Sequence, residues 1–424
     1  MSSFTIDVYQ NEYLPSDGAE VNAIVTVGSA AGDGPVHQPD AAEIVIVDTS
    51  GSMNVPRMKI KAAREATAVA IDCIRDGVAF GVISGAFDAH QVYPAQRGLI
   101  PASEPTRGEA KRIVAKLQAR GGTAMGTWLT LARQLFESVP GRICHAILLT
   151  DGENNNETEK QLNAVLAACE RKFQCDCRGV GTDWRVDELR RIASALLGSV
   201  DIIADPAAMA SDFRSMIEKA MSKATQSVSL RVWTPQGADL AFIRQVAPTV
   251  EELTDRGVEV NALTADYPTG TWGQELRDYH LCIRVQPRQV GDEMLAGRVT
   301  LLEGDEPLGQ GLIKAIWTDD EQLSTHISRE VAHYTGQAEL AECIQHGLEA
   351  RKAGDEAAAT SELGRAVKVA MESGNEGTMK LLEAVVEVVD PATGTVRLKQ
   401  EVADADEMAL DTRSTKTVRA RPGT

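Results

Sequence analysis

The sequence predicts an α/β fold: a doubly wound, mostly parallel sheet inserted in a β-sandwich, followed by a C-terminal helical module and a flexible tail. Three observations predict it. Apolar strands alternate with amphipathic helices through the middle of the chain, short alternating segments flank that region, and the C-terminal part turns helical. A chain of 424 residues is long enough for two or three domains, each with its own core.

Residues 1–40 are predicted to contribute strands to the sandwich. The segments "FTIDVYQ" and "AEVNAIVTV" alternate apolar and polar residues, as strands with one buried face do. Because a hairpin of two strands is marginally stable alone, we expect this pair to complete a sheet formed much later in the chain.

Residues 41–224 are predicted to form the inserted α/β domain. Its expected strands are "EIVIV", "VAFGVIS", "QVYP", "CHAILLT", "QCDCRGV" and "VDIIA". The first and fourth are continuous apolar runs, which is typical of central strands that are buried on both faces. Between the strands lie segments such as "RMKIKAAREATAVAIDCI", whose apolar positions three or four apart predict helices that pack on the sheet.

The remaining chain divides into three parts. Residues 225–320 contain short alternating segments, from "VSLRVWTP" to "GLIKAIWTD", and are predicted to form the rest of the sandwich. Residues 321–390 include "AELAECIQHGLEARKAG", "DEAAATSELGRAVKVAMES" and "EGTMKLLEAVVEVV", which predict a small helical module; no second copy at a fixed period indicates a solenoid. Residues 391–424 are poor in apolar residues and segregate acids from bases, which predicts a flexible charged tail.

Composition excludes several classes of function. The formal net charge of −18 argues against nucleic acid or an anionic membrane as the main partner, and suits divalent cations. No apolar stretch approaches the ~18 residues of a membrane span, and the first residues lack a signal-peptide pattern, so we expect a cytoplasmic protein. The seven cysteines are odd in number and scattered, which favours reduced thiols. Cys175 and Cys177 form a C-x-C without a matching Cys or His pair, so a zinc site is not expected.

Three segments place oxygen-bearing side chains at strand ends. "IVIVDTSGSM" ends a buried strand at Asp48 and continues with Ser50 and Ser52; "RGGTAMGTWL" carries Thr123 before a helix; and "AILLTDGENN" ends another strand at Asp151. Asp, Ser and Gly can serve merely to turn the backbone and cap a helix. However, the carboxyl ends of parallel strands share one edge of a sheet, so these five side chains converge if the two strands are neighbours. Hard oxygen donors without sulfur or imidazole suit Mg²⁺ or Mn²⁺.

These motifs resemble the metal-ion-dependent adhesion site of the von Willebrand factor A (VWA) domain family. The family pattern is D-x-S-x-S, then a threonine, then an aspartate, and "DTSGS", "GGT" and "TDG" match it in residue type and order. The resemblance covers about residues 41 to 224. It implies that Ser50, Ser52 and Thr123 coordinate the ion directly or through water, and that Asp48 and Asp151 act largely through bridging waters or hydrogen bonds.

The resemblance implies a docking function. One coordination position stays open for an Asp or Glu carboxylate from a protein partner, and in the family such binding can be linked to a shift of the last helix, here around residues 206 to 224. Intracellular bacterial VWA proteins resemble this chain better than surface adhesins or pilus proteins. Some of them work with kinases, phosphatases, forkhead-associated domains or AAA+ ATPases, which makes a signalling adaptor the favoured interpretation.

A metal-dependent hydrolase is the alternative from another class of function, because an open metal position can activate water. The nearest candidates for a base are Glu153, Asp88 and His90, and Glu153 is interpreted as an ordinary acid in a solvated loop. No G-x-S-x-G, P-loop or H-E-x-x-H motif occurs in the sequence. We therefore expect a protein without enzymatic activity.

The predicted tail suggests a second interaction. "DTRSTKTVRARPGT" places Thr412, Thr415 and Thr417 in a basic stretch, and phosphorylation there would create a ligand for an arginine-lined pocket. An unmodified solubilising tail explains the same composition, so both interpretations stand at this point.

Overall fold

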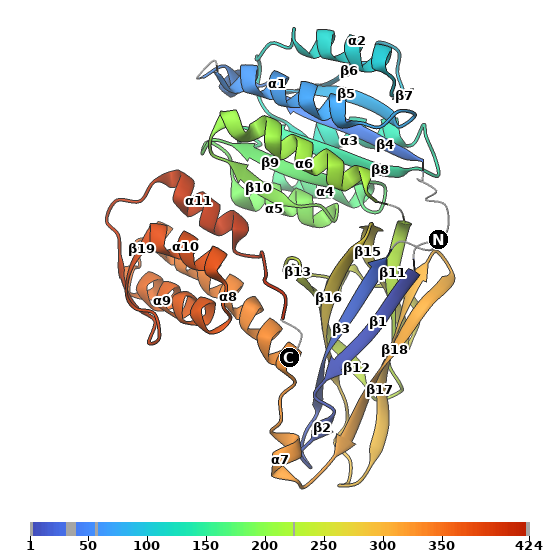
Figure 1. Ribbon diagram of the computed structural model, residues 1–424, viewed down its shortest axis with the longest axis vertical. Helices are drawn as coiled ribbons and strands as arrows, with labels where there is room; N and C mark the ends of the chain where they lie inside the picture. The colour runs from blue at the N-terminus through green and yellow to red at the C-terminus, as the bar shows by residue number, and fades with distance from the viewer. Residues whose placement is uncertain (1–2, 31–39, 56–57, 224, 421–424) are drawn as a thin grey trace. The chain divides into compact units, whose positions relative to one another are not determined.

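The computed structural model describes residues 3–30, 40–55, 58–223 and 225–420. The chain divides into two compact units: His37–Gln226, and a unit formed by Met1–Val36 together with Ser227–Thr424. The first unit is inserted in the second, as Figure 1 shows by the colours of the chain. The predicted fold class is confirmed: an α/β domain interrupts a region of antiparallel sheets, and helices follow.

The sheet of the inserted unit has the strand order β10-β9-β8-β4-β5-β6, with the short β7 paired to β5. Its central strands β4 and β8 are parallel neighbours, and every residue of β4 is buried. Only β6 and β7 run antiparallel to their neighbour β5 within the described part of this sheet. The strands are β4 (Ala41–Asp48), β5 (Ala79–Gly85), β6 (Ala89–Tyr93), β7 (Ile100–Pro101), β8 (Ile143–Thr150), β9 (Gln174–Val180) and β10 (Val200–Ile203).

Helices cover the sheet in two groups. α1 contacts both α2 and α6, and their apolar side chains join one core with β4, β5 and β8. α3 contacts α4, and α4 contacts α5, which forms the second group. The N-termini of α2 and α4 have capping boxes, at Ser103 and Thr158, which satisfy otherwise unpaired backbone amides. The helices are α1 (Met58–Cys73), α2 (Glu104–Val114), α3 (Met125–Phe136), α4 (Glu159–Cys169), α5 (Val186–Ala195) and α6 (Met209–Met221).

Two sheets form the sandwich of the other unit. One has the order β1-β3-β16-β12-β13 and the other β14-β15-β11-β17-β18-β2. The N-terminal strands enter both: β3 pairs with β16, and β2 pairs with β18. The strands are β1 (Ser3–Gln10), β2 (Tyr13–Leu14), β3 (Glu20–Ala30), β11 (Thr225–Trp233), β12 (Asp239–Ala247), β13 (Glu251–Glu252), β14 (Val258–Asn261), β15 (Thr264–Trp272), β16 (Glu275–Arg284), β17 (Glu293–Glu303) and β18 (Glu306–Trp317).

The two sheets face each other through apolar side chains. Phe4 of β1 meets Trp272 of β15 edge to face, with ring centroids 5.7 Å apart. A Cβ added at Gly311 of β18 would lie 2.5 Å from Val8 Cγ2 of β1, so glycine permits the close approach there. The sandwich therefore requires both the chain segment that precedes the inserted unit and the segment that follows it.

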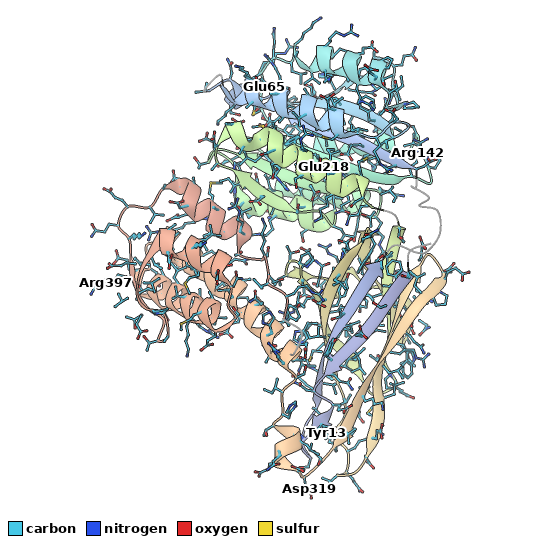
Figure 2. The ribbon with its side chains drawn as sticks, in the orientation of Figure 1. Tyr13, Glu65, Arg142, Glu218, Asp319 and Arg397 are labelled. Carbon is cyan, nitrogen blue, oxygen red and sulfur yellow. The ribbon has the colours of Figure 1, made fainter. Side chains whose placement is uncertain are left out.

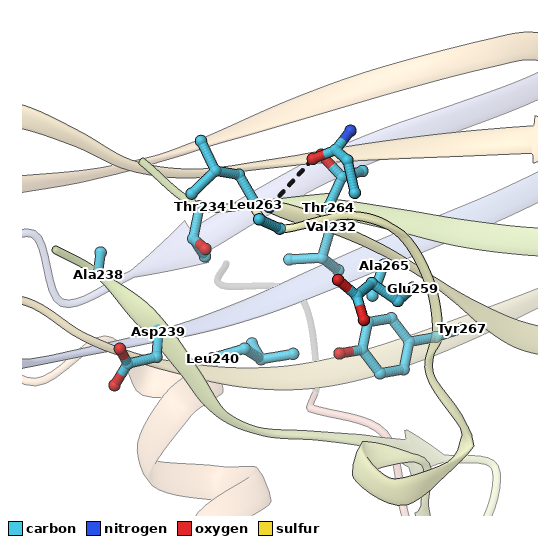
Figure 3. A pocket seen from close by; sticks show the side chains of 12 residues that line it. Val232, Thr234, Ala238, Asp239, Leu240, Glu259, Leu263, Thr264, Ala265 and Tyr267 are labelled. Carbon is cyan, nitrogen blue, oxygen red and sulfur yellow. Dashed lines mark hydrogen bonds between the residues drawn. The ribbon is translucent and has the colours of Figure 1, made fainter. Parts of the chain in front are cut away.

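A pocket of about 290 Å³ lies on this sandwich beside β14 and β15. Figure 3 shows its mixed lining, which includes Leu240 and Tyr267 as well as the carboxylates of Asp239 and Glu259. All its lining residues come from this second unit, and none of them is a metal-site residue predicted from the sequence.

The C-terminal part is helical, with a small hairpin. Leu340, Ile344, Leu363 and Leu382 belong to its core. Exposed charged side chains such as Arg397, and Glu65 in the other unit, extend outward from their elements (Figure 2). The elements are α7 (Glu321–Ser324), α8 (Arg329–Lys352), α9 (Glu356–Glu372), α10 (Glu376–Val385), β19 (Val386–Asp390), β20 (Thr395–Leu398) and α11 (Asp404–Arg413).

The structure corrects two predictions for this region. The end of the segment "EGTMKLLEAVVEVV" is not helical, because its valines form β19, which pairs with β20. A flexible tail over residues 391–424 is wrong for the described residues up to 420, which form β20, α11 and a C-terminal stretch bound to the sandwich.

The candidate phosphorylation sites accordingly do not lie in a flexible segment. Thr412 is 1% exposed within α11, and Thr417 donates a hydrogen bond from its hydroxyl to Val246 O. Thr415 is half-buried, and its carbonyl accepts a hydrogen bond from Val250 N. A kinase would have to detach this stretch before it could modify these residues.

Candidate metal site

The two predicted aspartates meet at one edge of the sheet. Asp48 is the last residue of β4, Asp151 directly follows β8, and both side chains are fully buried. Val47 is in register with Leu149, so the two strands end side by side. The adjacency that the sequence interpretation required is therefore present.

The Asp48 carboxylate is bound on both oxygens. Ser50 N donates to Oδ1 at 2.6 Å, and Thr150 Oγ1 donates to Oδ2 at 2.5 Å. Burial raises the pKa of Asp48 to about 6, although the hydrogen bonds from Thr150 and Ser50 act in the opposite direction. Asp48 thus fixes the loop after β4 against the end of β8.

The serines connect the two aspartates. Ser50 Oγ and Ser52 Oγ are 2.9 Å apart, and Ser52 Oγ donates to Asp151 Oδ1 at 2.7 Å. Ser50 is buried, and Ser52 lies in a short 3₁₀ turn, Gly51–Asn54, which turns the chain toward α1.

Thr123 approaches the same point from the loop before α3. Gly51 N donates to Gly121 O at 2.9 Å, which joins this loop to the serine loop. A Cβ added at Gly152 would lie 3.2 Å from Ser52 Oγ and 3.5 Å from Thr123 Oγ1, so glycine leaves a small cradle between the two hydroxyls. Within the described part of the chain, the Thr123 hydroxyl has no hydrogen-bond partner, although Thr123 is only 5% exposed.

The five residues fit a hard divalent cation. Three hydroxyls and two carboxylates converge around the cradle at Gly152, and among the described residues the Thr123 hydroxyl has no protein partner. Oxygen donors of this kind suit Mg²⁺ or Mn²⁺, which also retain water ligands readily. Among the described residues, no group of three or more His, Cys, Asp or Glu side chains could hold a metal, so this hydroxyl-rich set is the candidate.

The loop after β8 holds the start of α3. Ala124, the N-cap residue of α3, provides no side-chain cap. Instead, Asn154 Oδ1 accepts from Met125 N at 3.0 Å and Glu157 Oε1 accepts from Gly126 N at 2.6 Å. These bonds satisfy amides at the helix N-terminus and connect the Thr123 loop to the Asp151 loop.

Asn156 adds a third link, because its Oδ1 accepts from Thr123 N at 2.9 Å. Sequence reasoning missed this role, since the polar segment "DGENNNETE" predicts only a loop in which Glu153 is a solvated acid. The available signal for this role is the cluster of Asn154, Asn156 and Glu157 shortly after the aspartate at the end of β8.

Lys59 was also missed. It is the second residue of α1, and its Nζ lies 2.8 Å from Asp151 Oδ2 and 2.9 Å from Asp183 Oδ2. Burial lowers the pKa of this amine, but the hydrogen bonds to Asp151 and Asp183 outweigh that effect and raise it above its usual value. A cation therefore stands beside a carboxylate of the candidate metal site.

The three residues considered as a base for hydrolysis are exposed, unlike the buried aspartates of the candidate metal site. Glu153, Asp88 and His90 are exposed, and none donates to or accepts from the five site residues through its side chain. Cys175 and Cys177 are buried in β9 as free thiols. The hydrogen bond with Cys177 and burial raise the pKa of Cys175 well above its usual value, so Cys175 is a poor source of a reactive thiolate.

Comparison with known proteins supports the resemblance. Residues 42–202 match the von Willebrand factor type A domain, and residues 368–414 match the von Willebrand factor type A C-terminal domain. A solved von Willebrand factor type A protein from Catenulispora acidiphila is 48% identical, with a TM-score of 0.94; the match covers 99% of this chain and 97% of that one.

More distant matches share less. The ArnB paralog VWA2 from Sulfolobus acidocaldarius is 13% identical over 99% of this chain and all of its own, with a TM-score of 0.61, which shows a common fold. Inter-alpha-trypsin inhibitor heavy chain H4 from Homo sapiens is 28% identical over 52% of this chain. The chain spans about a quarter or less of the length of the curated relatives it matches. In the part of the chain that the structure describes, no helix is both long and apolar enough to span a membrane.

Proposed function

Because this chain belongs to the von Willebrand factor type A family, we propose that it docks a protein partner by presenting a divalent cation to a partner carboxylate. Asp48, Ser50, Ser52, Thr123 and Asp151 would hold the ion, with Mg²⁺ preferred and Mn²⁺ as the substitute. The observation that carries this proposal is the convergence of these five side chains around the cradle at Gly152. Mg²⁺ in such a site supplies a coordination position that a carboxylate oxygen can occupy.

The hydrogen bonds indicate different roles for the oxygen atoms that would surround the ion. Both oxygens of Asp48 and both of Asp151 accept hydrogen bonds from protein groups, so these carboxylates compensate the charge of an ion while the protein holds them in place. The Thr123 hydroxyl remains free for coordination among the described residues. A site with few direct anionic ligands keeps its affinity for an additional carboxylate.

The surface at this edge supports docking. Among the described residues of the inserted unit, the exposed large hydrophobic side chains are Val55, 72% exposed, and Phe87, 54% exposed. Val55 follows the turn of Ser52, and Phe87 follows β5, whose loop contacts the Thr123 loop through a hydrogen bond from Ala124 N to Ala86 O. Each of these exposed apolar side chains would offer contact area to a partner that binds at the metal site. The partner would offer an acidic residue with apolar neighbours.

We propose further that the protein is an adaptor in cytoplasmic signalling and not an enzyme. The acidic candidates for a hydrolytic base are exposed and hydrogen-bonded to none of the site residues by their side chains, which favours docking over water activation. A kinase, phosphatase, forkhead-associated domain or AAA+ ATPase is the proposed class of partner. Metal-dependent turnover of a phosphoester by the purified protein would instead favour a hydrolase.

The test is affinity capture from native lysate in Mg²⁺ and in EDTA, followed by mass spectrometry. Asp151→Ala removes a site carboxylate, whereas Asp88→Ala removes an exposed acid from a nearby loop and serves as the matched control. We expect a partner that is retained by the unaltered protein and by Asp88→Ala in Mg²⁺. The same partner should be lost in EDTA and with Asp151→Ala. Retention under all four conditions would refute metal-dependent docking.

A further inference from the structure

A buried cation lies beside the candidate metal site. The Lys59 side chain is 7% exposed and forms ion pairs with Asp151, which is fully buried, and Asp183, which is 70% exposed. Asp183 is largely screened by water, whereas the charge of Asp151 is not. The pairing with Asp151 is therefore the stronger of the two.

The fold fixes the position of this lysine. Lys59 lies in the first turn of α1, which packs on the sheet through the core, and its side chain lies near Gly181, the residue after β9. A Cβ added at Gly181 would lie 3.5 Å from Lys59 Cε and 3.7 Å from Nζ. The ammonium group therefore lies close to both Gly181 and Asp151.

Lys59 changes the charge of the site. Asp48 and Asp151 alone would neutralise a divalent cation, but Lys59 adds one positive charge within hydrogen-bond distance of Asp151. A divalent ion, Asp48, Asp151 and Lys59 together sum to one positive charge in a poorly solvated position, and Asp183 offsets that charge only in part, because its carboxylate is 70% exposed and screened by water. The positive charge of Lys59 attracts an incoming carboxylate, and the same charge repels the metal ion.

We infer that Lys59 is a specificity-determining residue that lowers the affinity of the site for the metal and raises the affinity of the loaded site for a carboxylate. The inference rests on the proposed docking function, which it extends. Lys59 also acts as a positioning residue, because its bond to Asp151 Oδ2 leaves Oδ1 for Ser52. Only the charge effect, however, moves the two affinities in opposite directions.

The experiment measures both affinities with defined probes. Calorimetry gives the binding of Mg²⁺ and Mn²⁺, and water-proton relaxation of the Mn²⁺-loaded protein reports acetate as it displaces bound water. Lys59→Met retains a side chain of similar length without the charge. The matched control is Lys61→Met on the same helix, because Lys61 is 74% exposed and pairs only weakly with Glu65.

We expect Lys59→Met to bind Mn²⁺ at least about fivefold more tightly and, once loaded, to bind acetate at least about fivefold more weakly. The variant loses both the repulsion between Lys59 and the metal ion and the attraction between Lys59 and acetate. Lys61→Met should change neither value by more than about twofold, as exposed charges are screened. A loss of both affinities in a folded Lys59→Met would reduce Lys59 to positioning alone and overturn the inference, as would no change in either.

Asp183→Asn provides a second variant that leaves Lys59 in place. It removes the exposed partner of the lysine, so we expect weaker metal binding and tighter acetate binding, each by about twofold. If Lys59→Met does not fold, Asp183→Asn tests the charge effect in its place. Tighter metal binding and weaker acetate binding by Asp183→Asn would overturn the inference. If the unaltered protein binds neither Mg²⁺ nor Mn²⁺, the proposed docking function itself fails, which is a distinct result.

Discussion

Arg419 donates two hydrogen bonds to Asp278, from Nε at 2.8 Å and from a terminal nitrogen at 2.9 Å, although the residues are 141 positions apart. Asp278 lies buried on β16 of the sandwich and also accepts from Tyr334 of α8 and Thr26 of β3. One carboxylate therefore joins the sandwich, the first long helix of the helical region and the end of the described chain. This network explains why residues expected to be flexible are ordered.

Arg419→Ala should loosen the C-terminal stretch without unfolding the sandwich. The pair is charge-assisted but Arg419 is 39% exposed, so we expect a local loss of about 1–2 kcal/mol. Amide hydrogen exchange at Thr417 and Val250, whose N–H groups bind across this junction, should become about tenfold faster. Arg397→Ala, which alters an exposed arginine of β20, is the control. Unchanged exchange would mean that the backbone pairing alone holds the stretch.

Asn154→Ala should weaken both α3 and the metal site. The variant removes the acceptor for Met125 N and the donor to Glu157, which itself caps Gly126 N. Loss of such a cap costs about 1–2 kcal/mol of unfolding free energy. We expect that loss in urea denaturation, together with a lower Mg²⁺ affinity because Thr123 is less firmly placed. Asn155→Ala changes the exposed neighbour, and an equal effect there would contradict the capping role.

Gly152→Ala should block the cation while the fold persists. Its methyl group would lie 3.2 Å from Ser52 Oγ and 3.5 Å from Thr123 Oγ1, in the cradle where the donors converge. Metal binding stabilises the unaltered protein by mass action, by about 2.7 kcal/mol at a concentration of one hundred times Kd. We expect thermal unfolding to shift upward with Mg²⁺ in the unaltered protein and not in the variant. An equal shift in both would place the ion elsewhere.

His145 should make stability depend on pH above neutrality. Its Nδ1 lies 2.9 Å from Glu43 Oε1 and its Nε2 lies 2.9 Å from Asp176 Oδ2. Burial acts to lower the pKa of His145, but the two carboxylates overcome that effect and raise it to about 10. The folded pKa exceeds the unfolded value of about 6.5, so this stabilisation is complete below pH 6.5 and is lost as the pH rises toward 10.

The measurement for His145 is the free energy of unfolding between pH 7 and 10. We expect the decline to be smaller in His145→Gln by on the order of 2 kcal/mol, relative to the unaltered protein. His326→Gln, at an exposed histidine, should leave the slope unchanged. Equal slopes in all three proteins would show that the triad with Glu43 and Asp176 does not titrate in this range.

Several features followed from the sequence because their signals are local. Continuous apolar runs predict β4 and β8 as central strands, and membership of the VWA family is confirmed by the matches to its relatives. Strand pairing then brought Asp48 and Asp151 to one edge, as parallel topology requires. Metal binding by these residues, the identity of the ion and the identity of the partner stay predictions.

By itself the sequence determined the central strands and the covering helices of the inserted unit and the oxygen donors at the strand ends, because apolar period and residue type can be read from neighbouring positions. Only the tertiary structure decided that Lys59 neutralises Asp151 and that the basic end of the chain is ordered against Asp278. Both outcomes are pairings of charges far apart in the chain. Composition records such charges but not their distances, and Coulomb energy depends on distance and burial.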